Sequence, residues 1–145
     1  MRVIIILFFA LLISKGRLFG QESKIAKEQL EAYCKTTIQL DSLSTIFEYQ
    51  LINTIYNAPL LNKGEVYNKI KKGDCSEVSN EQKTIYKDIL LEIDSMKSIY
   101  KKEYVKIIKN AVGLSQFNKI RHQLYSDSSL NVQYDALITE LSSGS

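Results

Sequence analysis

Residues 79–113 read SNEQKTIYKDILLEIDSMKSIYKKEYVKIIKNAVG and predict one long, uninterrupted helix. Ser79 can accept a hydrogen bond from the first turn and Gln82 can reach back to it, which is a capping box at the N-terminus. Gly113 suits the left-handed position that commonly ends a helix. Between these ends the apolar residues recur every three or four positions, at Ile85, Ile89, Ile93, Met96, Tyr100, Tyr104, Ile107 and Ala111. This spacing predicts a seam packed against a second helix.

That second helix is predicted from about Ser23 to Tyr56, a stretch without Gly or Pro. Pro59 follows it, and the residue before a proline is disfavoured in the α conformation. The residues expected on its inner face keep the same helical spacing, at Ala26, Leu30, Tyr33, Thr37, Leu40, Phe47 and Leu51. A second row, formed by Ile38, Ile46, Ile52 and Tyr56, widens the apolar stripe. A stripe of this width predicts contact with two neighbouring elements.

Three shorter helices are predicted in the remaining chain. One lies within residues 60–72, one spans 116–125 with Ser115 as its N-cap, and one spans 128–141 with Asp127 as its N-cap. A carboxylate at an N-cap also suits the positive end of the helix dipole. Their inward residues are expected to be Val66, Tyr67 and Ile70, then Phe117, Ile120 and Leu124, then Leu130, Tyr134, Leu137 and either Leu141 or Ile138.

The composition supports the same fold class. The chain has 6 Gly and 1 Pro, too few for the many turns of an all-β protein. We therefore expect an all-α fold, a helical bundle of two long helices plus two or three short helices. Residues 21–141 would form a single domain, which is long enough for a modest core, and residues 142–145 a disordered tail.

The N-terminus predicts export. A basic start at Arg2 precedes an apolar run over residues 3–13, which is shorter than the roughly 20 residues needed to span a bilayer. With a polar chain following Gly20, residues 1–20 resemble a secretory signal peptide cleaved before Gln21. An uncleaved membrane anchor is the alternative. We expect an exported protein that is periplasmic or secreted.

Two cysteines, Cys34 and Cys75, are the only ones in the chain. In an oxidising compartment an even pair predicts one disulfide. Cys34 would lie roughly 33 Å from the end of its helix, so the connection after Pro59 would have to fold back to bring Cys75 to it. Two free thiols, each packing as a small apolar residue, are the alternative.

The charge balance and the motifs argue against several chemistries. The chain has 19 basic and 16 acidic residues, but Arg2, Lys15 and Arg17 lie in the predicted signal, so the mature part is neutral. A nucleic-acid-binding protein needs a basic surplus, and none is expected here. His122 is the only histidine, so no metal site and no catalytic site are predicted. We expect no cofactor and no enzymatic activity.

Residues 113–141 carry a family resemblance. Gly113-Leu114-Ser115, then Phe117-Asn118 with Ile120, then Ser126-Asp127 with Leu130 resemble the closing motif of a bacterial family of short, secreted, all-helical domains of unknown function. That family has Pro where this chain has Ser128, and Ala32-Tyr33 matches a pair in its earlier helix. The resemblance implies an exported helical bundle and implies no particular activity.

Nine tyrosines leave two interpretations open. Tyr33, Tyr49 and Tyr56 fall on the first long helix and Tyr86, Tyr100 and Tyr104 on the second, where they can pack or form a binding surface. We expect a non-enzymatic protein of the bacterial envelope that binds another protein or an envelope component. The alternative is association with a membrane surface through an amphipathic helix or the retained N-terminus. The sequence leaves the oligomeric state open.

Overall fold

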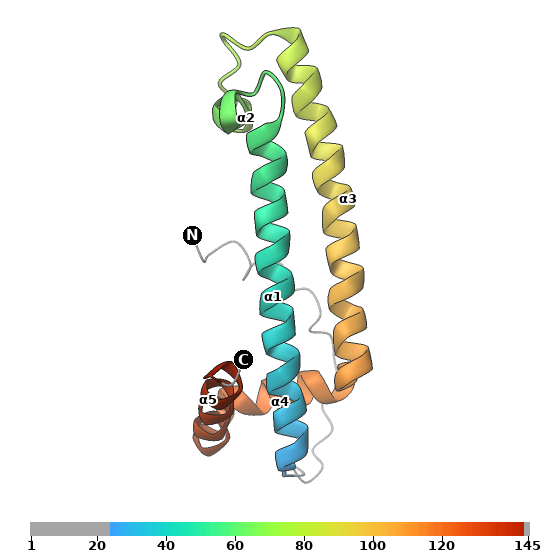
Figure 1. The fold of residues 1–145 in the computed structure, drawn as a ribbon, viewed down its shortest axis with the longest axis vertical. Coiled ribbons are helices and arrows are strands. Elements are labelled where there is room, and N and C mark those ends of the chain that lie inside the picture. Colours follow the sequence, from blue (N-terminus) through green and yellow to red (C-terminus); the bar gives the residue numbers. More distant parts are fainter. Residues whose placement is uncertain (1–23, 144–145) are drawn as a thin grey trace.

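The computed structural model describes residues 24–143, so the predicted signal peptide lies outside the described residues. Helix α1 spans Lys27–Asn57 and α3 spans Asn80–Ala111. They form a long antiparallel hairpin (Figure 1). A 3-10 turn η3 (Asn62–Gly64) and helix α2 (Glu65–Lys71) lie at the closed end, and α4 (Leu114–Ser126) and α5 (Ser128–Ser143) lie at the other. The described part contains no strand, which confirms the all-α class.

The predicted start of α3 is confirmed atom by atom. The Gln82 backbone N–H donates to Ser79 Oγ at 3.1 Å, and the Ser79 N–H donates to Gln82 Oε1 at 2.9 Å. Two N–H groups that would lack partners in the first turn are thereby satisfied. Asp127 caps α5 in the same way, because its Oδ1 accepts from the N–H groups of Ser129 and Leu130 at 2.9 and 3.0 Å.

The start of α4 differs from the prediction. Ser115 is not its N-cap, because α4 begins two residues earlier than predicted, at Leu114, and Gly113 occupies the cap position. Gly113 has φ +83° and its N–H donates to the Ile108 carbonyl at 2.8 Å. The glycine therefore ends α3 and turns the chain into α4 without an intervening loop. The prediction of a disordered tail over residues 142–145 is wrong for Ser142 and Ser143, which belong to α5; residues 144 and 145 lie outside the described residues.

The link from α1 to α2 is a turn of unusual backbone conformation. After Pro59, the φ angles of Leu60, Asn62 and Lys63 are +60°, +46° and +53°, and Gly64 has φ +87°. Leu61 lies within this run and is fully buried against the hairpin. The turn thus reverses the chain tightly and lets the Leu61 side chain anchor α2 to the ends of α1 and α3.

Two separate cores stabilise the fold. The lower core joins α1, α3, α4 and α5; its buried residues are Leu30, Tyr33, Cys34, Leu40, Ile108, Phe117, Ile120 and Leu130. The upper core joins α1, α2 and α3 with the turn before α2; its buried residues are Leu61, Tyr67, Ile89 and Ile93. Each core forms where a short helix adds a third layer to the hairpin, because two helices alone leave most of their surface in water.

Neither long helix can cross a membrane. Within residues 24–143 no helix is both long enough and apolar enough to span one.

Candidate functional site

The hairpin has a middle section without a buried residue, although Leu51 and Ile55 at its upper end pack against the upper core and Tyr104 and Ile107 at its lower end pack against the lower core. We call residues 41–57 of α1 and 94–107 of α3 the central hairpin; none of them is buried. The two helices meet there through a short seam. The rings of Phe47 and Tyr100 lie 4.7 Å apart, and the Thr54 hydroxyl lies 3.8 Å from Met96 Sδ. The seam joins two helices only, so their remaining faces stay open.

One open face is apolar. Ile46, Tyr49, Ile52 and Tyr56 of α1 are 54, 71, 54 and 48 % exposed, and we call them the α1 outer face. At about 100° per residue, these four positions fall within an arc of about 120°. Figure 1 shows α5 beside the lower part of α1 and α2 beside its upper end, while along the stretch between them α3 is the packed neighbour.

The same stretch is poor in charge. Between Asp41 and Lys63 the chain carries a single charged side chain, Glu48. On α3, by contrast, Lys, Asp and Glu occur along the whole length of the helix. Depletion of charged residues and enrichment of tyrosine are typical of the central part of protein–protein interfaces. The α1 outer face is therefore the candidate binding surface of the described chain.

Exposed apolar residues on α3 have a different setting. Leu91 is 71 % exposed and Ile99 is 59 % exposed, but Glu92, Lys97 and Lys101 lie close to them in the sequence. Isolated apolar side chains among charges are common on protein surfaces and need no partner. Leu91 therefore serves below as the matched control for Tyr49.

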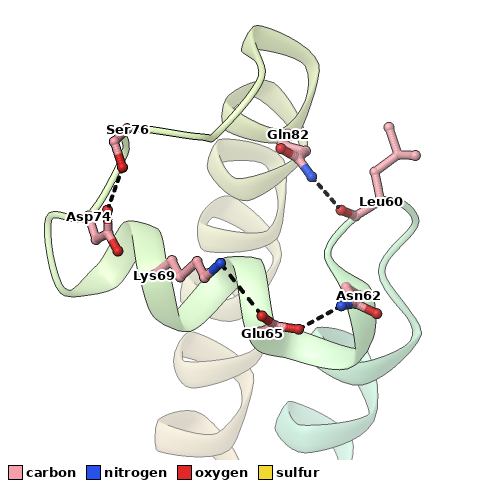
Figure 2. Close-up of polar contacts among 7 residues, drawn as sticks. All are labelled: Leu60, Asn62, Glu65, Lys69, Asp74, Ser76 and Gln82. Atoms are coloured by element: carbon pink, nitrogen blue, oxygen red, sulfur yellow. Dashed lines mark hydrogen bonds and ion pairs between the residues drawn. The ribbon is translucent and has the colours of Figure 1, made fainter.

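A polar cavity of about 260 Å³ lies where α2, the residues before α3 and the start of α3 meet. Figure 2 shows how its side chains pair with one another. Glu65 accepts a hydrogen bond from Asn62 at 2.6 Å and pairs with Lys69 at 3.6 Å. Asp74 accepts from the Ser76 hydroxyl at 3.0 Å. Because these polar groups already have partners within the loop, their arrangement stabilises the connection.

Gln82 connects this region to the turn before α2. Its side chain completes the capping box with Oε1, and its Nε2 donates to the Leu60 carbonyl at 3.1 Å (Figure 2). One side chain thereby joins the first turn of α3 to the positive-φ run that follows α1. The function of Gln82 is structural.

The tyrosines divide between the two interpretations. Tyr33 packs in the lower core, with its ring 4.7 Å from Phe117 and 6.0 Å from Tyr134. Burial raises the pKa of Tyr33, and likewise that of Tyr104, to about 12. Tyr49 and Tyr56 are exposed instead. Packing therefore accounts for the tyrosines near the cores, and Tyr49 and Tyr56 belong to the candidate surface, whereas Tyr125 on α4 is exposed outside it.

A second cavity, of about 210 Å³, lies between α1, α4 and α5 beside these packed rings. Tyr33, Tyr125, Tyr134 and Arg121 line it. Asn131, also in the lining, donates its side-chain N–H to the Leu124 carbonyl at 3.2 Å. This contact ties the start of α5 to the end of α4 and helps to hold the lower core together.

The predicted disulfide is not formed: both cysteines are free. Cys34 is buried in the lower core, whereas Cys75 is exposed in the connection before α3. The connection does not fold back along α1, because Leu61 and Tyr67 hold it at the closed end of the hairpin. Burial raises the pKa of the Cys34 thiol to about 11, so Cys34 packs as a small apolar residue.

The other candidate groups do not assemble into a site. His122 lies exposed on α4, and within the described residues no three His, Cys, Asp or Glu side chains are grouped to hold a metal ion. The signal that marks the candidate surface was visible in the sequence as a long interval with a single charged residue, Glu48. The second row of apolar residues predicted on α1 includes Ile46, Ile52 and Tyr56, but it was expected to pack against a neighbour.

Comparison with protein-family models, with characterised proteins and with solved structures finds no match. The resemblance of residues 113–141 to a family of secreted helical domains stays a prediction.

Proposed function

We propose that this chain is an exported, non-enzymatic helical protein that binds another protein or an envelope component through the α1 outer face. Export rests on residues 1–20, and the binding function rests on the central hairpin. The observation that carries the proposal is that residues 41–57 of α1 include no buried residue, while the α1 outer face in this segment is apolar and nearly uncharged.

Free energy favours covering this surface. Moving a Tyr or Ile side chain from water into a packed contact contributes roughly 1.5–3 kcal/mol when burial is complete. The four side chains of the α1 outer face are about half exposed or more. A partner helix laid along α1 would supply the layer that α5 supplies to the lower core and α2 to the upper core.

The charge pattern favours a protein partner over a membrane surface. A helix that lies on a membrane usually carries Lys and Arg on its polar face, where they meet anionic lipid headgroups. Between Ser42 and Asn62 there is no basic residue at all. Anchoring through a retained N-terminus stays the alternative to a cleaved signal peptide, and the intact mass of the exported protein distinguishes the two because it shows whether residues 1–20 are removed.

Site-specific photo-crosslinking tests the proposal. Tyr49 and, in a matched variant, Leu91 are replaced by benzoylphenylalanine in cells that produce and export the protein. Both positions are 71 % exposed, so neither replacement removes a buried side chain. We expect one defined adduct from position 49 and none from position 91. The proposal fails if the two positions give the same adducts or if position 49 gives none.

A vesicle flotation experiment tests the alternative that the protein binds a membrane surface. Flotation of the exported protein with phosphatidylcholine vesicles, and with vesicles containing an anionic lipid, should leave the protein unbound. Flotation that is abolished by Tyr49→Lys but not by Leu91→Lys would replace the protein partner with a lipid surface.

A further inference from the structure

We infer that the α1 outer face is covered by a second copy of this chain, with the two α1 helices antiparallel and the two central hairpins forming a four-helix arrangement. This inference rests on the proposed function and identifies its partner. The upper and lower cores each gain a third helix from within the chain, and the central hairpin gains its missing layers from the second copy.

The order of residues on the face is self-complementary. In a two-fold symmetric interface each contact occurs twice. If residue i of the first copy contacts residue j of the second, then residue j of the first copy contacts residue i of the second. With the two-fold axis near residue 51, Ile46 faces Tyr56 of the second copy and Tyr49 faces Ile52 of the second copy. Each pair matches an aliphatic with an aromatic side chain, over a length of about 15 Å of helix.

The charge of the face also suits a copy of itself. Two identical surfaces that carry charge of one sign repel each other. Here the only charged side chain within the interval is Glu48, and at one end of the face the Lys63 ammonium lies 5.7 Å from the centre of the Tyr56 ring. Glu48 is turned by about 100° from Tyr49 around the helix, which places it on the flank of the contact. The two Glu48 carboxylates would be offset by about 9 Å along the axis, so their repulsion is weak.

The exposed area of the α1 outer face indicates how tightly two copies should associate. Taking a whole side chain at about 200 Å², the four residues expose on the order of 400 Å² per copy. A standard interface buries about 800 Å² per partner, so polar residues must add to the contact: Asn53 within the same arc, and Gln50 and Asn57 at its edge. We therefore expect a dimer that dissociates at micromolar concentrations.

Sedimentation equilibrium of the exported protein measures this association. We expect a monomer–dimer equilibrium for the wild type, a dissociation constant at least tenfold weaker for Tyr49→Lys, and no change for Leu91→Lys. Circular dichroism at 222 nm checks that both variants keep the wild-type helix content. A wild type that stays monomeric up to 1 mM would overturn the inference, and so would a dimer that Tyr49→Lys leaves intact.

Crosslinking tests the antiparallel register. In a Cys75→Ser background, Asn53→Cys places two thiols about 6 Å apart along the helix axis, on opposite sides of the two-fold axis. Their addition to a short bismaleimide should give a covalent dimer, whereas Leu91→Cys in the same background should not. Equal yields from the two positions would contradict the register.

Failure of this inference is distinguishable from failure of the proposed function. A monomeric protein whose position 49 crosslinks to one different protein excludes the second copy and keeps the binding surface. A protein that is monomeric and gives no adduct at position 49 excludes both.

Discussion

Gly64 and Gly73 offer a matched pair for testing the turn that precedes α2. Their φ angles are +87° and +83°, so an alanine at either position meets the same backbone penalty. Their surroundings differ. A Cβ at Gly64 would lie 3.1 Å from Ile55 Cγ2 of α1, whereas a Cβ at Gly73 would have no atom within 4 Å. Comparing the two substitutions separates backbone strain from close packing.

The expected loss of unfolding free energy in each alanine variant follows from backbone strain and close packing. A left-handed conformation costs a residue with a Cβ about 1–2 kcal/mol. Loss of glycine freedom in the unfolded chain returns about 0.4–1 kcal/mol. Gly73→Ala should therefore lower the free energy of unfolding by about 1 kcal/mol or less. Gly64→Ala adds the crowding against Ile55, and overpacking typically costs 1–3 kcal/mol, for a total of about 2–3 kcal/mol.

Urea denaturation followed by circular dichroism at 222 nm measures both values. Ile55→Ala provides a further control, because it removes Cγ2 and should make Gly64→Ala less costly than in the wild type. Equal losses for Gly64→Ala and Gly73→Ala, or a cost at Gly64 that Ile55→Ala leaves unchanged, would refute the argument that α1 and the turn are in tight contact there.

Three other outcomes follow from the cores and caps. A thiol reagent at pH 8 should label Cys75 rapidly and Cys34 only after unfolding, because Cys34 is buried and its pKa is raised to about 11. The free energy of unfolding should fall as pH rises, because the pKa values of Cys34, Tyr33 and Tyr104 are raised in the folded state and these groups ionise first in the unfolded chain. The contribution of Cys34 should be lost between about pH 9 and 11, and those of Tyr33 and Tyr104 between about pH 10 and 12. For Tyr33 the loss is on the order of 2–3 kcal/mol; urea midpoints across this pH range measure it. Asp127→Ala removes two hydrogen bonds from the start of α5 and should cost about 1 kcal/mol in urea denaturation.

Each of these has a contradicting result. Labelling of both thiols at equal rates would place Cys34 at the surface. A urea midpoint that is constant between pH 9 and 12 would mean that the phenols and the thiol are not buried. An unchanged stability in the Asp127 variant would mean that the cap contributes nothing.

Local signals in the sequence predicted the elements well where the chemistry is local. The capping box at Ser79 and Gln82 and the cap at Asp127 depend only on residues three positions apart, and both are present. Ser115 was misassigned because Gly113, with its positive φ, can begin the next helix directly. The spacing of apolar residues identified the helices and their inner faces, since Leu30, Ile89 and Phe117 are buried as predicted, but it did not show that most of the second row on α1 stays exposed.

The disulfide shows where local reasoning ends. Two cysteines and a predicted export signal favoured a bond between Cys34 and Cys75, although the required fold-back of the connection was visible in the sequence. The positive-φ turn and the burial of Leu61 direct α2 to the closed end of the hairpin, and this separates the two thiols. Such a contact joins residues far apart in the chain, so no spacing in the sequence encodes it.

By itself, then, the sequence determined the helices, because hydrophobic periodicity and caps act within a few residues. It also held the interval between Asp41 and Lys63, in which Glu48 is the single charged residue. The tertiary structure alone decided that Ile46, Tyr49, Ile52 and Tyr56 of this interval stay exposed. Exposure depends on which elements pack beside α1, and α2 and α5 reach only its two ends.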